Sequence, residues 1–397
     1  HNNKTLQLKL ETTSLFFTQT IFIMTGAAQP CLKEFVHRGF TFKNRLGLSP
    51  LTRGRADYPS ANPNDLHVDY YTQRASGGFI LTEATGISRR QLGWFKAPGI
   101  YNEEHVEHWK KVTESVHKAN GLIFCQMWAM GRAGHSDVMG DTPLAPSPIA
   151  LKGEVTAAHH EKKPYETPIE MTQEDINNTV NDFRNAARNA IAAGFDGVQI
   201  HSANGYLVDT FLQSCSNKRE DKYGGSLENR LRFLKEILEA VTSEVGPERT
   251  WIRFSPNGAF QEMGSEDNLE TFDAAIQLAA SYKIGVIEVM DGVTFGFHEK
   301  TERYTLERAR KNAQKGNPDA ENPTAIMGNV GHTAESANKE IGDGHADLIS
   351  IGRPYISNPD LPDRIREGIE LAPVADYADW WTKEGAEGYT TFPKATA

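Results

Sequence analysis

Cysteine is scarce in this sequence, with three among 397 residues, and Cys31, Cys125 and Cys215 are widely separated. So few and so scattered thiols exclude a disulfide framework and a zinc site built on a C-x-x-C pair. The chain also lacks a G-x-G-x-x-G turn and a Walker A pattern. These absences argue against a doubly wound dinucleotide-binding fold and a P-loop nucleotide site.

An excess of positive charge is absent as well. The 42 Lys and Arg residues stand against 52 Asp and Glu residues, which gives a formal net charge of −10. An acidic chain without a Lys/Arg block attracts neither nucleic acid nor an anionic membrane. No apolar run approaches the ~20 residues of a membrane span. We therefore expect small molecules, and not nucleic acid or a membrane, as partners.

The first residues differ in character from the rest. An apolar stretch over residues 15–23 ends just before Met24 and is interrupted by polar residues 18–20. This pattern fits part of a targeting peptide, or a leader in front of a native start at Met24, and the polar interruption favours the leader. We interpret residues 1–30 as a leader or disordered N-terminus and residues 31–397 as one domain. For the compartment we favour the cytoplasm, with an organelle as the alternative if the segment is a targeting remnant.

Short apolar runs rich in β-branched residues recur along the chain, each followed by a polar loop and an amphipathic stretch. There are eight such runs: Arg45–Thr52, Gly78–Gly86, Gly121–Trp128, Phe195–His201, Thr250–Ser255, Ile284–Asp291, Thr324–Gly328 and Ala346–Gly352. Apolar strands alternating with helices are typical of a buried parallel sheet. The pattern therefore predicts an α/β fold, a (β/α)8 TIM barrel.

Two of the intervening helices are clear from their apolar period. Residues 174–193 carry an apolar face, with Thr172 as the expected N-cap. Residues 227–245 repeat the pattern and are followed by Gly246 as a stop signal. Residues 131–172 exceed by far the usual βα loop of ~2–6 residues. We expect them to form a long excursion after the third strand, on the catalytic side of the barrel.

Polar residues follow several of the predicted strands, which is where this fold carries its chemistry. His201 and Asn204 follow the fourth run at a spacing that lets both side chains turn into the barrel mouth. Two donors converging on one point would polarise a carbonyl oxygen and stabilise an enolate, and Tyr206 could donate a proton. The alternative is that His201 and Asn204 cap a helix and that Tyr206 only packs. Asp209 is a single carboxylate with no partner at metal-ligand spacing, so we expect no metal.

Arg253 ends the fifth run as a charge among apolar neighbours. A buried guanidinium needs an anionic partner. That partner is either an internal carboxylate such as Glu288 or an electron-rich ligand, and the sequence leaves both open.

The last two runs end in glycine followed by a polar residue, at Gly328-Asn329 and Gly352-Arg353. Barrels commonly bind phosphate at this place through backbone N–H groups. With Gln126 near the end of the third run, these residues favour a flat phosphorylated cofactor such as FMN, lying across the barrel top.

The segment HSANGYLVDTFLQ at residues 201–213, continued by DKYGGSLENR at residues 221–230, resembles the Old Yellow Enzyme family of FMN-dependent ene-reductases. Further similar motifs are Pro50-Leu51-Thr52-Arg53, Tyr70-Tyr71-Thr72-Gln73-Arg74, Ala145-Pro146-Ser147-Pro148 and residues 352–361. Thr52 stands where the thermophilic-like members carry a cysteine. The resemblance is therefore to the yeast, plant and enterobacterial branch.

The resemblance implies an NADPH dehydrogenase, or ene-reductase, with a ping-pong cycle. NADPH or NADH reduces FMN, which then transfers hydride to the β-carbon of an α,β-unsaturated carbonyl or nitro compound. His201 and Asn204 would hold the carbonyl or nitro oxygen. Tyr206 would protonate the α-carbon, and Trp128 would form a wall of the substrate pocket.

The resemblance also implies a set of flavin contacts. Thr52 would lie at flavin O4, Gln126 at the pyrimidine edge, and Arg253 near N1 and O2, where negative charge gathers on reduction. The remaining residues of the implied FMN site are Pro50, Leu51, Ala84, His201, Gly328, Asn329, Ser350, Gly352 and Arg353, with Gly328, Asn329, Gly352 and Arg353 at the phosphate.

The chain departs from the family at two places. Ala84 stands where many relatives have glycine, and Trp380-Trp381-Thr382 replaces a Phe-Tyr pair near the pocket lid. Trp94, Phe95, Phe295 and Phe297 are candidate aromatic gates. Substrate range therefore stays open, as do NADPH against NADH and monomer against homodimer.

Several other functions remain as alternatives. A 12-oxophytodienoate-type reductase and a nitroester reductase would use the same flavin chemistry on narrower substrates. A barrel hydrolase or lyase would use His201 and Glu288 without a flavin. In a non-catalytic flavoprotein, FMN would serve binding or sensing.

Overall fold

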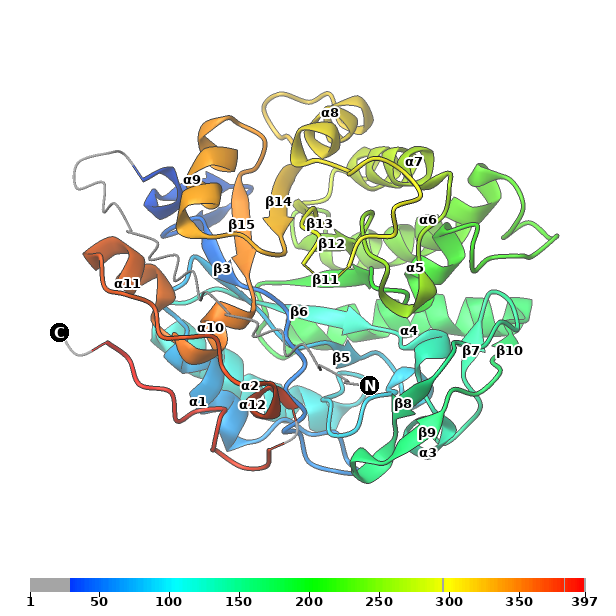
Figure 1. The fold of residues 1–397 in the computed structure, drawn as a ribbon, viewed down its shortest axis with the longest axis horizontal. Helices are drawn as coiled ribbons and strands as arrows, with labels where there is room; N and C mark the ends of the chain where they lie inside the picture. The colour runs from blue at the N-terminus through cyan, green and yellow to red at the C-terminus, as the bar shows by residue number, and fades with distance from the viewer. Residues whose placement is uncertain (1–28, 295, 382, 396–397) are drawn as a thin grey trace, which may run out of the picture.

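A closed barrel of eight parallel strands forms the centre of the computed structural model, which describes residues 29–294, 296–381 and 383–395 (Figure 1). The strands are β3 (Leu46–Leu48), β4 (Phe79–Leu81), β6 (Ile123–Trp128), β11 (Gly197–Ser202), β12 (Thr250–Phe254), β13 (Val286–Met290), β14 (Ala325–Asn329) and β15 (Leu348–Ile351). The barrel closes because β6 pairs with both β4 and β11. The predicted barrel is confirmed, and the leader predicted from residue 1 lies, up to residue 28, outside the described residues.

Helices follow the strands and surround the barrel (Figure 1). They are α1 (Asp65–Gln73), α2 (Glu103–Lys118), α4 (Gln173–Ala192), α6 (Leu227–Val245), α7 (Asn268–Ser281), α8 (Leu306–Gly316), α9 (Ala334–Gly342) and α11 (Leu361–Glu367). Thr172 caps α4 as expected, because its side chain accepts from the Asp175 N–H while the Asp175 carboxylate accepts from the Thr172 N–H. Gly246 ends α6 with a φ of +88°.

The second apolar run differs from the expectation, because it breaks into β4 and β5 (Thr85–Gly86), and β5 pairs with β6. The break occurs at Glu83, which is 1% exposed. Its Oε2 accepts the backbone N–H groups of Arg53 and Gly54 at 3.1 and 3.3 Å. The chain leaves the ladder here because a buried carboxylate must find donors.

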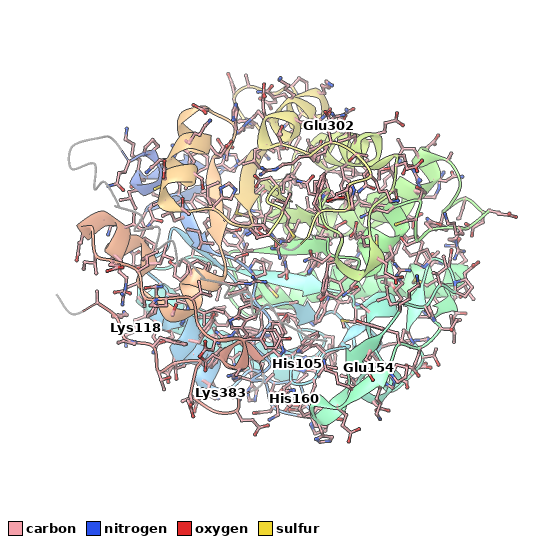
Figure 2. The ribbon with its side chains drawn as sticks, viewed as in Figure 1. His105, Lys118, Glu154, His160, Glu302 and Lys383 are labelled. Atoms are coloured by element: carbon pink, nitrogen blue, oxygen red, sulfur yellow. The ribbon has the colours of Figure 1, made fainter. Side chains whose placement is uncertain are left out.

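The long excursion after β6 carries α3 (Ser136–Met139), β7 (Leu144–Ala145), β8 (Glu154–Thr156), β9 (Lys162–Pro164) and β10 (Ile169–Glu170). β7 pairs with β10, and β8 pairs with β9 as a hairpin. Glu154 and His160 mark this excursion at the lower rim of the molecule (Figure 2).

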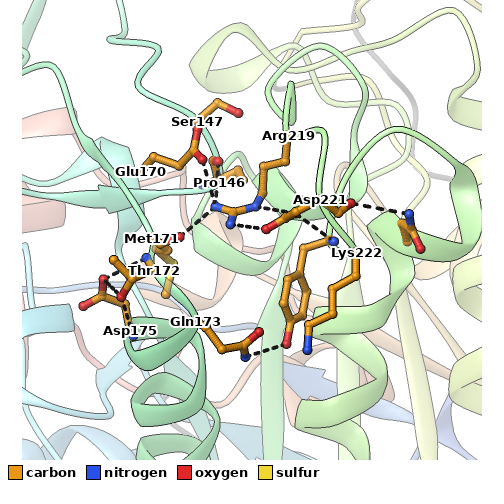
Figure 3. Close-up of polar contacts among 12 residues, drawn as sticks. Pro146, Ser147, Glu170, Met171, Thr172, Gln173, Asp175, Arg219, Asp221 and Lys222 are labelled. Atoms are coloured by element: carbon orange, nitrogen blue, oxygen red, sulfur yellow. Dashed lines mark hydrogen bonds and ion pairs between the residues drawn. The ribbon is translucent and has the colours of Figure 1, made fainter.

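Arg219, in the segment before α6, holds two parts of the excursion, one just after β7 and one just after β10 (Figure 3). Its Nη1 donates to the carbonyl oxygens of Pro146 and Met171 at 3.2 and 2.8 Å. Its Nη2 lies 2.5 Å from a carboxylate oxygen of Asp221. Since the guanidinium is buried and charge-assisted bonds are strong, this contact fixes the excursion against the barrel.

Aromatic side chains fill the amino-terminal end of the barrel. Phe79, Phe124 and Trp251 come from the strands, and the Phe124 and Trp251 rings stack with centroids 3.9 Å apart. The hairpin of β1 (Phe35–His37) and β2 (Phe40–Phe42) adds Phe42 from below, in contact with Phe79 and Trp251. Because side chains fill this end, the carboxyl end of the strands is the place to look for a ligand site.

We expect Trp251→Ala to lower the free energy of unfolding by about 3–5 kcal/mol, since it removes the largest ring of this plug and leaves a cavity. Urea denaturation at equilibrium measures the change. The exposed Val36 of β1 provides the control, because Val36→Ala should stay within about 0.5 kcal/mol of the parent. A loss below 1 kcal/mol for Trp251→Ala would contradict a tightly packed plug.

Candidate active site

The loop after β11 brings the three predicted catalytic residues together. His201 lies on β11 and is 3% exposed, Asn204 follows with a φ of +59°, and Tyr206 precedes α5 (Leu207–Leu212). Tyr206 occupies the N-cap position of α5, and its side chain makes no hydrogen bond to the backbone of that helix. The alternative in which His201 and Asn204 cap a helix is therefore wrong.

The sharp turn between His201 and Tyr206 has identifiable supports. The Asn204 N–H donates to Ser255 Oγ at 2.7 Å, and the Gly205 N–H donates to Asp209 Oδ2 at 2.8 Å. Gly205 has a φ of +72°, and a Cβ there would lie 2.8 Å from side-chain atoms of Gln261. Asparagine and glycine are the residues that tolerate this left-handed conformation, so the motif dictates the turn.

The rings of His201, Tyr206 and Trp128 form one wall. Tyr206 lies edge-to-face against His201 with centroids 4.9 Å apart and against Trp128 with centroids 5.0 Å apart. Burial lowers the pKa of His201 well below its ordinary value, and the charge of Arg253 lowers it further. Burial raises the pKa of the Tyr206 phenol. At neutral pH, the site therefore presents an uncharged imidazole and a phenol that keeps its proton.

A chain of hydrogen bonds crosses the barrel interior below this wall. Gln126 Nε2 donates to Gln199 Oε1 at 2.8 Å, and Gln199 Nε2 donates to Glu288 Oε2 at 2.8 Å. Ser350 Oγ donates to Glu288 Oε1 at 2.5 Å. The Gln126 side chain thus points into the barrel, where it joins a hydrogen-bond network. Its place at the pyrimidine edge of the flavin stays a prediction.

Arg253 has the internal partner that the sequence left open. Its Nε lies 3.4 Å from Glu288 Oε2, close enough for an ion pair but without the alignment of a hydrogen bond. Its Nη2 donates to Asn329 Oδ1 at 2.6 Å. The salt bridge exists, and the guanidinium still has a buried N–H without a hydrogen-bond acceptor.

Gly328 and Asn329, which we expect at the phosphate, also make contacts within the protein. A Cβ on Gly328 would lie 2.8 Å from a side-chain atom of Leu306 in α8, so close packing of β14 against this helix already favours a glycine. The Asn329 amide donates to Ser49 and Ser350, and its backbone N–H donates to Asp291. Both residues therefore have structural roles as well as their predicted place.

Gly352 and Arg353 begin α10 (Arg353–Ser357) at the carboxyl end of β15. The guanidinium of Arg353 lies over the Trp380 ring, 4.5 Å from its centroid. Trp380 belongs to α12 (Tyr377–Trp381), and its neighbour Trp381 packs edge-to-face against Trp94. The two tryptophans of the tail thus lie at the mouth, and Thr382 lies outside the described residues.

The donor set at the mouth fits FMN. Buried side-chain nitrogens that have no hydrogen-bond partner among the described residues include His201 Nδ1, Trp128 Nε1 and Arg253 Nε. Buried polar atoms are nearly always paired, so three such atoms at one place call for a ligand rich in acceptors. The loop after β3 adds buried Pro50 and half-buried Leu51 and Thr52.

Ala84 and the aromatic gate candidates vary in their placement. Ala84 is 4% exposed and packs in a cluster with Trp128, Trp94 and Tyr206. Phe95 is buried away from this cluster's rings, against His159 and His160 of the excursion. Phe297 lies against the ring of its neighbour His298 at a tilted angle, and Phe295 lies outside the described residues. Of the four gate candidates, Trp94 is the one that packs with the catalytic wall among the described residues.

Sequence reasoning missed Arg53, which anchors the tail. Its Nε donates to the Trp380 carbonyl at 2.8 Å, and its Nη2 donates to the carbonyls of Asp379 and Gly388 at 2.9 and 2.7 Å. The side chain is fully buried and lies beside the stacked rings of Tyr70 and Tyr389, 5.1 Å from the centroid of each. A charged residue directly after a buried strand was the signal that could have revealed it.

Asp209 is the other missed residue, and it determines a pH dependence. Burial raises its pKa to about 6, against the opposing effects of Gln213, the Gly205 N–H and Arg132. A raised carboxyl pKa means that the folded state binds the proton more tightly, so stability falls as the pH rises from the unfolded pKa to the folded one. Asp209→Asn cannot ionise and should not show this loss.

We therefore expect the free energy of unfolding of Asp209→Asn, relative to the parent, to rise by about 1 kcal/mol between about pH 5 and about pH 7.5. Urea denaturation of both proteins across this range measures the difference. A difference that does not change with pH would show that Asp209 ionises in the folded protein as it does in water.

Within residues 29–395, apart from 295 and 382, no group of three or more His, Cys, Asp and Glu side chains is placed to hold a metal ion. In the same part of the chain, no helix is both long and apolar enough to cross a membrane.

The chain is similar to proteins that are named as flavin oxidoreductases or 12-oxophytodienoate reductases. A model of the NADH:flavin oxidoreductase / NADH oxidase family matches residues 36–372. Putative 12-oxophytodienoate reductase 11 of Oryza sativa subsp. japonica is 37% identical over 375 residues, covering 93% of this chain and 98% of that protein. Flavin oxidoreductase hxnT of Emericella nidulans is 37% identical over 372 residues, covering 90% and 95%.

Solved structures agree with these relatives. The old yellow enzyme homologue from Zymomonas mobilis superimposes with a TM-score of 0.85 at 39% identity, covering 91% of this chain and 99% of that one. Morphinone reductase in complex with tetrahydroNAD gives a TM-score of 0.82 at 32% identity, covering 92% and 98%. The chain belongs to the NADH:flavin oxidoreductase / NADH oxidase family and is an Old Yellow Enzyme, an FMN-dependent ene-reductase that takes its electrons from NAD(P)H.

Proposed function

We propose that His201 and Asn204 hold the carbonyl or nitro oxygen of an activated alkene and that Tyr206 protonates its α-carbon. The observation that carries the assignment is the wall at the mouth, where an uncharged, unpaired imidazole and a protonated phenol lie with ring centroids 4.9 Å apart. Asn204 follows on the rigid turn between them.

The physical reason is the charge that develops on the substrate. When the β-carbon of an enone is reduced, negative charge collects on the carbonyl oxygen, and donors already in place stabilise it without reorganisation. A neutral His201 donates a proton in a hydrogen bond without losing it. Trp128 packs on Tyr206 and would orient the alkene between the phenol and the barrel.

The chain's own residues would hold the cofactor from three directions. When bound, FMN supplies the two-electron redox chemistry, with NAD(P)H as the reductant of a ping-pong cycle. Pro50, Leu51, Thr52 and Ala84 would border the ring, Gln126 and Arg253 would meet its polar edge, and the phosphate would lie at the last two strands. The residues at that end are Gly328, Asn329, Ser350, Gly352 and Arg353.

For the substrate we favour activated alkenes in general, that is, unsaturated carbonyl and nitro compounds. A narrower 12-oxophytodienoate-type reductase is the second candidate, because several relatives that are 35–37% identical carry that name. Turnover of cyclic enones, nitroalkenes and nitrate esters by one preparation distinguishes these from a nitroester reductase. A monomer or homodimer and a cytoplasmic location stay predictions.

The first test follows the visible spectrum of the purified protein under nitrogen. We expect a yellow protein that bleaches with NADPH or NADH and regains its colour when cyclohexenone is added, so that both half-reactions appear in one cuvette. A protein that stays colourless after FMN has been added and washed out would contradict the flavin site and favour the barrel hydrolase or lyase.

The second test isolates the proton donor. Tyr206→Phe should slow the reoxidation of the reduced protein by cyclohexenone by about 10²–10⁴-fold, as expected when a general acid is lost. Reduction by NADPH should keep its rate, because no proton from Tyr206 enters that half-reaction. Stopped-flow absorbance measures each half separately.

Tyr165→Phe is the matched control, since Tyr165 packs against the same cluster as Tyr206 and has no assigned role. It should leave both rates unchanged. Equal slowing by both variants, or none by Tyr206→Phe, would overturn the assignment.

A further inference from the structure

Glu288 is a buried carboxylate in the middle of the barrel. Its side chain is fully buried on β13, directly opposite Arg253 in the pairing of β13 with β12. Three groups contact it: Gln199 Nε2 at 2.8 Å, Ser350 Oγ at 2.5 Å and Arg253 Nε at 3.4 Å. The catalytic roles proposed above give this residue no task.

The groups that contact Glu288 are hydrogen-bond donors. Gln199 receives a hydrogen bond on its Oε1 from Gln126 and presents its amide N–H to Glu288. Ser350 Oγ accepts from the Asn329 amide at 2.6 Å and donates to Glu288. Both oxygens of Glu288 therefore accept, and the third contact is the guanidinium of Arg253. Donors and a guanidinium on both sides stabilise the carboxylate form.

The positive charge of Arg253 affects groups at the mouth of the barrel. The same guanidinium that contacts Glu288 also reaches Asn329, and it contributes to the lowered pKa of His201. In a buried site a charge acts over a longer range than in water. Any charge that offsets Arg253 from below therefore changes the potential that a ligand at the mouth experiences.

We propose that Glu288 sets the reduction potential of the bound FMN by offsetting the positive charge of Arg253. Two electrons and one proton convert oxidised FMN to its anionic reduced form, so reduction adds one negative charge to the ring. Arg253 favours that charge, and Glu288 opposes it. Glu288 thus keeps the reduced cofactor a stronger reductant toward the alkene, and the enzyme gives up some driving force for reduction by NAD(P)H.

This proposal rests on the flavin function proposed above. Glu288 acts through Arg253 and does not contact the substrate. A purely structural role would change stability or FMN affinity but would leave the potential where it is. The potential is therefore the decisive readout.

The test compares the FMN potential of the parent holoenzyme with that of Glu288→Gln, by equilibration with a redox dye under nitrogen. Glutamine has the same shape, can still accept from Gln199 and can donate to Ser350, so it removes the charge and keeps the network. At a fixed potential we expect the ratio of reduced to oxidised FMN to rise at least tenfold, which is a shift of about +30 mV for a two-electron couple.

Two variants of the same residue keep the test decisive. Glu288→Asp keeps the charge and should stay close to the parent. Glu288→Met has a similar length and no charge, and it should shift the potential in the same direction as Glu288→Gln if that variant does not fold.

Glu302→Gln is the control for loss of a negative charge elsewhere. Glu302 lies at the outer edge of the molecule (Figure 2), its side chain is 74% exposed, and solvent screens it. The FMN reduction potential of the Glu302→Gln variant should equal that of the parent.

An unchanged ratio in both neutral variants, with FMN bound and reducible by NADPH, would overturn the proposal for Glu288 alone. A parent protein that does not take up FMN would overturn the proposed function instead. A fall in the ratio would show that Glu288 acts on the flavin with the opposite sign, and would also overturn the proposal.

Discussion

The interior of an eight-stranded barrel has to be filled, and this constraint determines the rest of the molecule. At the amino-terminal end, large rings such as Trp251 fill it. Toward the carboxyl end, the inward-facing residues are Gln199, Arg253 and Glu288, which are polar and pair with one another. The amino-terminal end of the barrel thus provides close packing, and the carboxyl end provides a network of charged and hydrogen-bonded groups.

The turn that carries the catalytic residues lies just beyond the polar end of the barrel, and hydrogen bonds fix its geometry. Asp209 and Ser255 receive the backbone N–H groups of Gly205 and Asn204, and they fix the left-handed turn that carries Asn204 and Tyr206. The geometry is therefore set by groups that need not touch a substrate. A rigid support of this kind is what preorganised donors require.

Much of this could be predicted from the sequence. The eight strands are visible because each is an apolar run, and the end of a strand such as β11 marks His201 and its neighbours directly. The break at Glu83 was not predicted, because it depends on the bonds of this carboxylate to the backbone of Arg53 and Gly54, about 30 residues away in the chain. The Glu288 network could be predicted only in part. Glu288 was a candidate partner of Arg253, but strands buried on both faces do not reveal that Gln199 and Ser350 also point to it. The bonds of Arg53 to the tail join segments more than 320 residues apart, a separation that no local pattern spans.

The tail has a consequence for sequence changes at the rim of the barrel. Arg353 lies over the ring of Trp380, and Arg53 near the start of the barrel holds the backbone of residues 379–388. The family model ends at residue 372, before this segment begins. Trp380 therefore connects the loop after β3 with the turn after β15, so a substitution at one of these three positions changes the contacts of the other two.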